Sequence, residues 1–412
     1  MSGAASGPTA PDTGPARTGV TAPAGFLAAA VRCGIRRGQP DLALVVSERE
    51  AAAAAVFTRN RVQAAPIVLS RAALAASGGR ARAILVNSGN ANACTGPPGD
   101  LAARRSAETL AGLLDVPADR VLVASTGVIG EQLPVERLID SLPRAVARLS
   151  TTGGAAAAEA ILTTDTCSKQ SVRRVDGPGG SYTIGGMVKG SGMIHPDLAT
   201  TLAFVTTDAD VPARPLGEIL RRAADLSFNR LTVDGDTSTN DMIAVLANGA
   251  SGVCADGAAP DLDGFARALT EVLVELARAV ARDGEGATRL ITVRVTGAAS
   301  EVDALAVART VAGSLLVKTA VHGADANWGR IAAAAGRAGV DIRPEALTVT
   351  INGLAVLSPG YLSEFSEEEA SKRLAEDEVV LGVDLGTGAA EATTWTCDLT
   401  RGYIDINASY RS

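Results

Sequence analysis

The sequence has few aromatic residues, only two histidines and no long apolar run. Aromatic residues make up 3% of its 412 residues, so the core must consist mostly of Ala, Val, Leu and Ile. No apolar stretch reaches the ~18 residues that a membrane-spanning helix needs. Lys and Arg total 38 against 45 Asp and Glu, a net charge of -7, which disfavours binding to nucleic-acid phosphates. We therefore expect neither a membrane nor a nucleic acid as a partner.

Paired cysteines and an apolar leader are also lacking. The five cysteines are scattered and form no C-x-x-C motif, so their spacing indicates neither a zinc site nor a disulfide framework; they are Cys33, Cys94, Cys167, Cys254 and Cys397. Residues 1–18 are mostly Gly, Ala, Pro, Ser and Thr without an apolar centre, which predicts a flexible tail and not a signal peptide. These features favour reduced thiols and a cytoplasmic localisation.

The residues that are present predict an α/β protein. Hydrophobic residues make up 47% of the chain, enough for a sizeable core, and short apolar runs alternate with amphipathic patterns. Strands are predicted at residues 42–47, 67–70, 83–90, 121–125, 171–175, 182–188, 201–207, 243–247, 290–297, 347–353 and 379–386. Helices are predicted at residues 100–114, 135–150 with a break or kink at Pro143, 155–162, 214–226, 261–282, 302–313 and 327–338. A domain seam is expected near residue 290, after Gly284-Glu285-Gly286.

The most informative stretch is VKGSGMIHPDLATTLAFVTTDA at residues 188–209. Glycines upstream of Thr200 permit the strained backbone that a hydroxyl needs to attack its own preceding carbonyl. Cleavage before Thr200 would free its amine, whose ordinary pKa of ~7.7 to 8.0 suits a general base for the neighbouring hydroxyl. The same residues also fit a tight connection between two strands, with Lys189 in solvent, and their spacing alone leaves both interpretations open.

Several separated blocks resemble the ornithine acetyltransferase family, whose bifunctional members are also glutamate N-acetyltransferases. Besides KGSGMIHPDLATTLAF, the blocks are GVTAPAGF, VFTRNRVQAAPI, NSGNANACTG, STGVIGEQLP, ILTTDTCSKQ, DGDTSTND, LVKTAVHGADANWGR and INASYRS. They run in one order from residue 19 to the last residue. The resemblance implies an αββα sandwich of the N-terminal-nucleophile type with a smaller C-terminal α/β domain.

The resemblance also assigns roles to residues. Thr200 matches the nucleophile, which becomes N-terminal when the chain splits between Ala199 and Thr200. Thr126 and Gly127 match the pair that forms the oxyanion hole. The positions that match substrate-binding residues are Thr163, Lys189, Thr200, Glu285, Asn407 and Ser412. The implied pieces are an α chain of residues 19–199 after the tail and a β chain of residues 200–412, with a C-terminal subdomain from about residue 290, assembled as an α2β2 heterotetramer.

The implied activity is the transfer of an acetyl group from N-acetylornithine to glutamate through an acetyl-threonine ester, a step of arginine biosynthesis. Neither a metal nor a dissociable cofactor is expected, and acetyl-CoA would be a second acetyl donor in a bifunctional enzyme. Two alternatives stay open: an N-terminal-threonine amidohydrolase or aminopeptidase, which gives the acyl group to water, and an uncleaved binding relative.

Three positions depart from the family pattern, and one motif imitates a metal site. Thr201 stands where relatives have Met, which leaves two adjacent hydroxyls at the cleavage point, and His195 and Asp197 replace small or amide residues. DGDTSTND resembles the start of a calcium loop, but Thr239 replaces the required glycine and Val245 the bidentate Glu. Calcium binding is therefore not expected.

Overall fold

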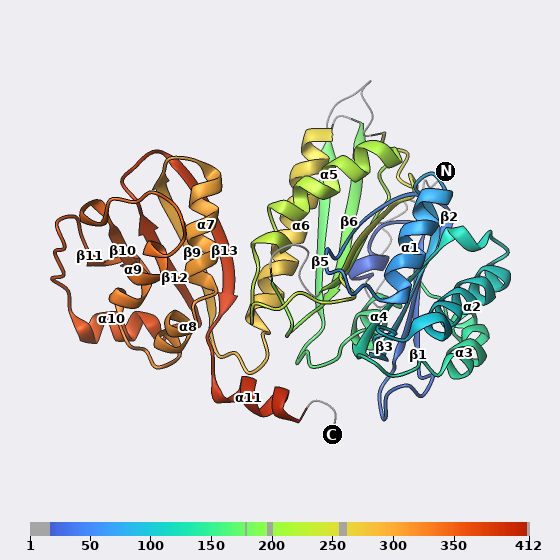
Figure 1. The fold of residues 1–412 in the computed structure, drawn as a ribbon. Helices are drawn as coiled ribbons and strands as arrows, with labels where there is room; N and C mark the ends of the chain where they lie inside the picture. The colour runs from blue at the N-terminus through green and yellow to red at the C-terminus, as the bar shows by residue number, and fades with distance from the viewer. Residues whose placement is uncertain (1–16, 178, 196–200, 255–261, 410–412) are drawn as a thin grey trace, which may run out of the picture.

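The computed structural model describes residues 17–177, 179–195, 201–254 and 262–409, and Figure 1 shows their arrangement. Its first sheet contains β1 Phe26–Val31, β2 Leu42–Phe57, β3 Arg80–Asn90, β4 Val121–Val128, β5 Lys169–Gly177, β6 Gly180–Lys189, β7 Leu202–Thr207 and β8 Met242–Ala247. Its second contains β9 Leu290–Ala298, β10 Thr348–Ile351, β11 Leu354–Leu357, β12 Glu378–Asp384 and β13 Ala390–Cys397. The helices are α1 Ala65–Ala76, α2 Gly96–Leu114, α3 Val135–Ala147, α4 Gly154–Ala160, α5 Ala213–Asp225, α6 Leu262–Arg282, α7 Glu301–Ala312, α8 Leu315–His322, α9 Trp328–Gly336, α10 Glu367–Leu374 and α11 Arg401–Ala408.

The long strand β2 connects two halves of the first sheet, whose order is β4-β3-β2-β8-β7-β6-β5 with β1 also paired to β2. Its first part pairs with β1 and β3, and its second part pairs with β8. The register against β3 shifts between Val46 and Ala51, as expected where a strand bends. The bend allows one half of the sheet to pack on the other.

Alternating side chains show that the two halves form separate layers. On β7, Leu202 and Phe204 belong to a core between the two halves, whereas Ala203 and Val205 face α5 and α6. On β3, neighbouring residues divide in the same way between the central core and a core under α2 and α3, because successive side chains of a strand point to opposite faces. The layers are therefore helices, sheet, sheet and helices, with α5 and α6 opposite α2 and α3 in Figure 1. This confirms the predicted αββα sandwich.

The second sheet starts at Leu290 and has the order β11-β10-β12-β9-β13. Only the pair of β12 and β9 is parallel in it. Its buried residues join those of α7 and α9 in a core of their own, and Figure 1 shows it as a smaller body that ends in α11. A mixed sheet with helices on it is the α/β arrangement expected for the C-terminal part of the chain.

Two details of the predicted secondary structure are wrong. Residues 67–70, predicted as a strand, lie in α1, because Pro66 occupies the first turn and Ile67, Ser70 and Ala73 fall on one buried face. A four-residue apolar run cannot by itself distinguish a buried helix from a strand. The helix at residues 135–150 is also not broken at Pro143, since α3 continues through it to Ala147.

In the described part of the chain, no single helix is both long and apolar enough to cross a membrane. The pair α7 and α8 meets those criteria only when taken together, and a bend of 57° separates the two.

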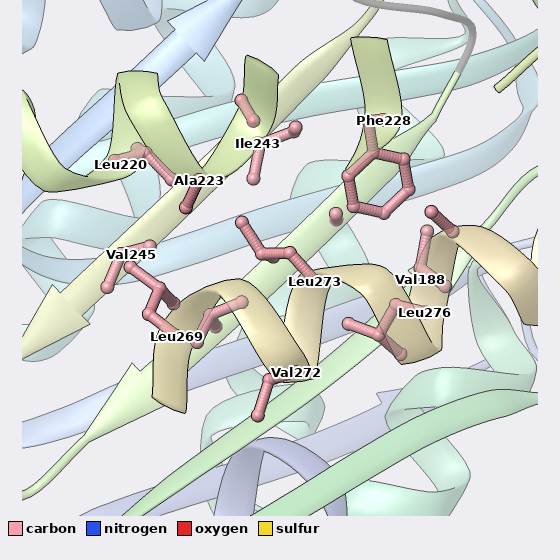
Figure 2. Close-up of a cluster of buried hydrophobic side chains, with 14 of the residues drawn as sticks. Val188, Leu220, Ala223, Phe228, Ile243, Val245, Leu269, Val272, Leu273 and Leu276 are labelled. Atoms are coloured by element: carbon pink, nitrogen blue, oxygen red, sulfur yellow. The ribbon is translucent and has the colours of Figure 1, made fainter. Parts of the chain in front are cut away.

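A cluster of aliphatic side chains holds α5 and α6 against the outer face of β5–β8. Figure 2 shows Leu273 of α6 among residues such as Ala223, Phe228 and Ile243, all of which are buried. Because the sandwich contains few aromatic residues, packing of this kind supplies most of the apolar area buried on folding.

We expect Leu273→Ala to destabilise the protein by about 2–5 kcal/mol, since the truncation leaves a cavity in this cluster. The matched control is Leu101→Ala on α2, where the leucine is 55% exposed, with a change within about 0.5 kcal/mol. Urea denaturation of both variants measures the difference. Equal midpoints would contradict this account of the cluster.

Candidate active site

A cavity of about 250 Å³ is lined by residues of the first sheet, of the loop that precedes β8 and of the C-terminal helix α11. Six of the residues that the sequence singled out line it: Thr126, Gly127, Thr163, Lys189, Glu285 and Asn407. The remaining ones, Ala199, Thr200 and Ser412, lie outside the described residues. The structure thus brings together every candidate residue that it describes, although they come from segments more than 280 positions apart in the chain.

Strand pairing brings the ends of three strands to the cavity. Lys189, the last residue of β6, pairs with Leu202 at the start of β7, and Leu202 pairs in parallel with Met242 at the start of β8. Thr201, the second residue after the predicted cleavage bond, therefore lies at the same edge of the sheet as Lys189. The backbone N–H of Thr201 donates to Asp241 Oδ1 over 2.9 Å.

Gly127 lies in a strand and not in a simple turn. It pairs with Gly89 of β3 where the register of β3 and β4 shifts. Its φ is 132° and a Cβ there would lie 2.2 Å from the carbonyl carbon of Gly89, so only glycine fits. The side chain of the preceding Thr126 is buried at the cavity wall. A strained backbone beside a threonine hydroxyl is compatible with an oxyanion hole.

Lys189, which lines the cavity, belongs to a cluster of four buried charged side chains, and the other three lie behind the wall: Asp165, Lys169 and Asp283. Lys169 Nζ lies 2.8 Å from Asp165 Oδ1 and 2.5 Å from Asp283 Oδ2. Lys189 Nζ lies 3.9 Å from Asp165 Oδ2 and donates to Thr126 Oγ1 over 3.3 Å. Alternating charges of this kind compensate for much of the cost of burial.

The ionisation of the cluster follows from burial and from these partners. Burial alone would raise the pKa of Asp165, but the ammonium groups of Lys189 and Lys169 hold its pKa well below the usual range. Burial lowers the pKa of Lys189, against the opposing effect of Asp165. Burial also raises the pKa of Asp241 well above its ordinary value, and Asp241 Oδ2 accepts no hydrogen bond within the described residues. Burial thus favours the neutral form of the Asp241 carboxyl group.

The cavity lining also carries a carboxylate held by the C-terminal helix. Asn407 Nδ2 of α11 donates to Glu285 Oε2 over 2.7 Å, and the backbone N–H of Glu285 donates to the carbonyl of Ser191. Gly192 lies against this carboxylate, since a Cβ at Gly192 would come within 2.3 Å of Glu285 Oε2. The cavity is thus lined by both a basic side chain, Lys189, and an acidic one, Glu285.

Sequence reasoning missed two parts of the site. Ser238, Thr239 and Asn240, considered only as a false calcium loop, line the cavity. Asn240 Nδ2 donates to the carbonyls of Ala91 and Ser125, which ties this loop to the threonine-glycine segment. Asp165 was also missed. The three loop residues lie in the block DGDTSTND, and Asp165 lies in the block ILTTDTCSKQ. Their place in these blocks was the only feature of the sequence that could have indicated a role in the site.

Comparisons with known proteins show the family of the chain. A model of the ArgJ family matches residues 27–412. The "Arginine biosynthesis bifunctional protein ArgJ" of Chlorobaculum tepidum is 49% identical over 97% of this chain and 98% of that protein. The protein of the same name from Symbiobacterium thermophilum is 51% identical over 96% and 98%. A crystallised ornithine acetyltransferase of Mycobacterium tuberculosis, complexed with ornithine, is 42% identical over 45% of this chain and 97% of that chain, with a TM-score of 0.41.

We expect Gly192→Ala to raise the KM for N-acetylornithine by about tenfold, equivalent to about 1.4 kcal/mol, because the new methyl group displaces the Glu285 carboxylate. The control is Gly336→Ala, where a Cβ meets no atom within 4 Å. Steady-state kinetics of both variants test this, and an unchanged KM in Gly192→Ala would show that the carboxylate does not contact substrate.

Proposed function

Because the chain belongs to the ArgJ family, we propose that this cavity moves an acetyl group from N-acetylornithine to glutamate through an ester on Thr200. As a family member, the protein is an acetyltransferase of arginine biosynthesis, an ornithine acetyltransferase and glutamate N-acetyltransferase. The observation that carries the mechanism is the convergence of Thr126, Gly127, Lys189 and Glu285 on one cavity beside Thr201.

The first half of the reaction forms the ester. The Thr200 amine takes the proton of its own hydroxyl while Oγ attacks the acetyl carbonyl carbon. The Thr126 hydroxyl and the Gly127 N–H donate to the oxygen that becomes negative, and each such donor contributes about 3 kcal/mol in the transition state. The bond from the acetyl carbon to nitrogen then breaks, the nitrogen takes the proton from the ammonium of Thr200, and ornithine leaves.

The second half regenerates the enzyme. The neutral amine of glutamate attacks the acetyl carbon of the ester and gives up a proton to the amine of Thr200. The bond from the acetyl carbon to Thr200 Oγ then breaks, and the ammonium of Thr200 returns that proton to Oγ. Lys189 supplies a cation for a substrate carboxylate, and Glu285, held by Asn407, supplies an anion for a substrate ammonium group. The backbone N–H and the hydroxyl of Thr163 both donate to Asp165 Oδ2, over 3.0 and 3.5 Å. These contacts hold Thr163 at the cavity wall, where it can contact the amino-acid portion of the substrate.

The proposed nucleophile requires self-cleavage between Ala199 and Thr200 into pieces of 199 and 213 residues. The pairing of β6 with β7 and of β2 with β8 supports a lasting association of the pieces, because each pair joins one strand from either piece. Their buried side chains also share two cores. The assembled enzyme is then an α2β2 tetramer in the cytoplasm. No metal or dissociable cofactor takes part in the scheme, and acetyl-CoA is a second acetyl donor to be tested with glutamate as acceptor.

We expect Thr200→Ala to abolish both self-cleavage and transfer, since the variant lacks the hydroxyl that each reaction needs. Denaturing gel electrophoresis should show only the full-length chain, and N-acetylglutamate should not form. Substantial turnover by this variant would refute the assignment of the nucleophile.

A transferase and a hydrolase differ in where the acetyl group goes. Incubation of the wild-type protein with N-acetylornithine should yield N-acetylglutamate when glutamate is present and little acetate when it is absent, because water is a poorer acceptor than the bound amino acid. Quantification of both products by chromatography tests this. Acetate release that is independent of glutamate would favour the amidohydrolase alternative.

A further inference from the structure

Asp165 is a completely buried carboxylate that contacts several groups of the cavity wall, although it does not itself line the cavity. Its Oδ1 accepts from the backbone N–H of Gly190 over 2.6 Å and from Lys169 Nζ over 2.8 Å. Its Oδ2 accepts from the backbone N–H of Thr163 over 3.0 Å and lies 3.9 Å from Lys189 Nζ. A carboxylate with this many donors is held in one orientation.

The contact between Lys189 and Thr126 has a direction that depends on the charge of Lys189. An ammonium group has three donors and no acceptor. When Lys189 is charged, Thr126 Oγ1 must accept from it, and the hydroxyl proton of Thr126 must point elsewhere. A neutral amine has a lone pair and can accept that proton instead. The charge on Lys189 therefore decides whether Thr126 can donate its proton toward the cavity.

Four titratable groups act electrostatically on Lys189: Asp165, Lys169, Glu285 and Asp241. Lys169 repels the charge on Lys189. Asp241 Oδ1 accepts from the backbone N–H of Thr201. Glu285 lies in the cavity and is hydrogen-bonded to Asn407. Among the described carboxylates, Asp165 is the one that lies within 4.0 Å of Lys189 Nζ, and its side chain is completely buried.

We propose that Asp165 is a positioning residue for acetyl transfer: it keeps Lys189 charged, and Lys189 in turn holds the Thr126 hydroxyl with its proton available to the developing oxyanion. This inference rests on the proposed function and deepens it. Lys169 and Asp283 hold Asp165 in place. Lys169 forms ion pairs with both Asp165 and Asp283, and Asp283 also accepts from the backbone N–H of Thr166 over 3.0 Å.

The test is Asp165→Asn, which removes the charge and keeps one of the two side-chain oxygens. The N–H groups of Gly190 and Thr163 donate to different oxygens of Asp165, so the amide oxygen can accept from only one of them. Burial lowers the pKa of Lys189 and Asp165 opposes that effect, so the variant should have a lower Lys189 pKa. The active, charged form is present below that pKa and is lost as pH rises through it. The ratio of wild-type to variant kcat should therefore increase with pH, reaching roughly ten to a hundred at alkaline pH, as for a partly lost oxyanion donor.

A double-mutant cycle with Thr126→Ala identifies the route of the effect. If Asp165 acts through the Thr126 hydroxyl, Asp165→Asn should change kcat by less than about twofold in the Thr126→Ala background. The buried-carboxylate control is Asp398→Asn, which removes a charge near His322 and Thr288 and should leave the dependence of kcat on pH as in the wild type.

The Lys189→Arg variant gives a measurement that does not depend on whether Asp165→Asn folds and cleaves itself. Arginine stays charged throughout the range and only donates, so the processed variant should lack the alkaline loss of kcat caused by Lys189.

The proposed function itself fails if the wild-type protein forms no N-acetylglutamate. If the wild type is active, any of three results would overturn the positioning role. The first is a ratio of wild-type to Asp165→Asn kcat that does not change with pH, and the second is full additivity of the effects of Asp165→Asn and Thr126→Ala on kcat. The third is a Lys189→Arg variant whose kcat falls at alkaline pH as the wild-type kcat does.

Discussion

The pairing of β7 with β6 on one side and β8 on the other determines where chemistry can take place in this molecule. β7 begins at Leu202, the third residue after the predicted cleavage bond, and the register places Lys189 and Met242 beside Leu202. Central strands of a buried sheet cannot shift by one residue without exchanging their two faces. Since those faces belong to two separate cores, the position of Thr201 relative to Lys189 is fixed by packing throughout the sandwich.

Buried charges then give this edge of the sheet its chemical character. Two lysines and two aspartates form one buried cluster at the cavity wall, and groups of this kind are kept only where each charge has a partner. Asp241 shows the opposite tendency, because burial raises the pKa of its carboxyl group and its Oδ2 accepts no hydrogen bond within the described residues. The environments of Asp165 and Asp241 therefore shift the pKa values of two carboxyl groups in opposite directions.

The sequence predicted the layers and most of the site, and its failures have physical reasons. Periodic apolar patterns located the strands at 83–90 and 243–247 well, but the four-residue run at 67–70 was assigned to the wrong element because such a run fits either structure. The Thr126, Lys189 and Glu285 positions came from the family resemblance. Asp165 and Asn240 were missed because their roles depend on contacts across the fold, which neither composition nor spacing encodes.

In the proposed reaction the acetyl group is carried as an ester on Thr200, the first residue of the chain formed by self-cleavage. The most direct measurement is the intact mass of both pieces after incubation with N-acetylornithine and no glutamate. We expect the piece of residues 200–412 to gain the mass of one acetyl group. Peptide mapping should locate this group on Thr200, and the group should be lost when glutamate is added. Unchanged masses of both pieces, together with active transfer once glutamate is supplied, would contradict the proposed reaction.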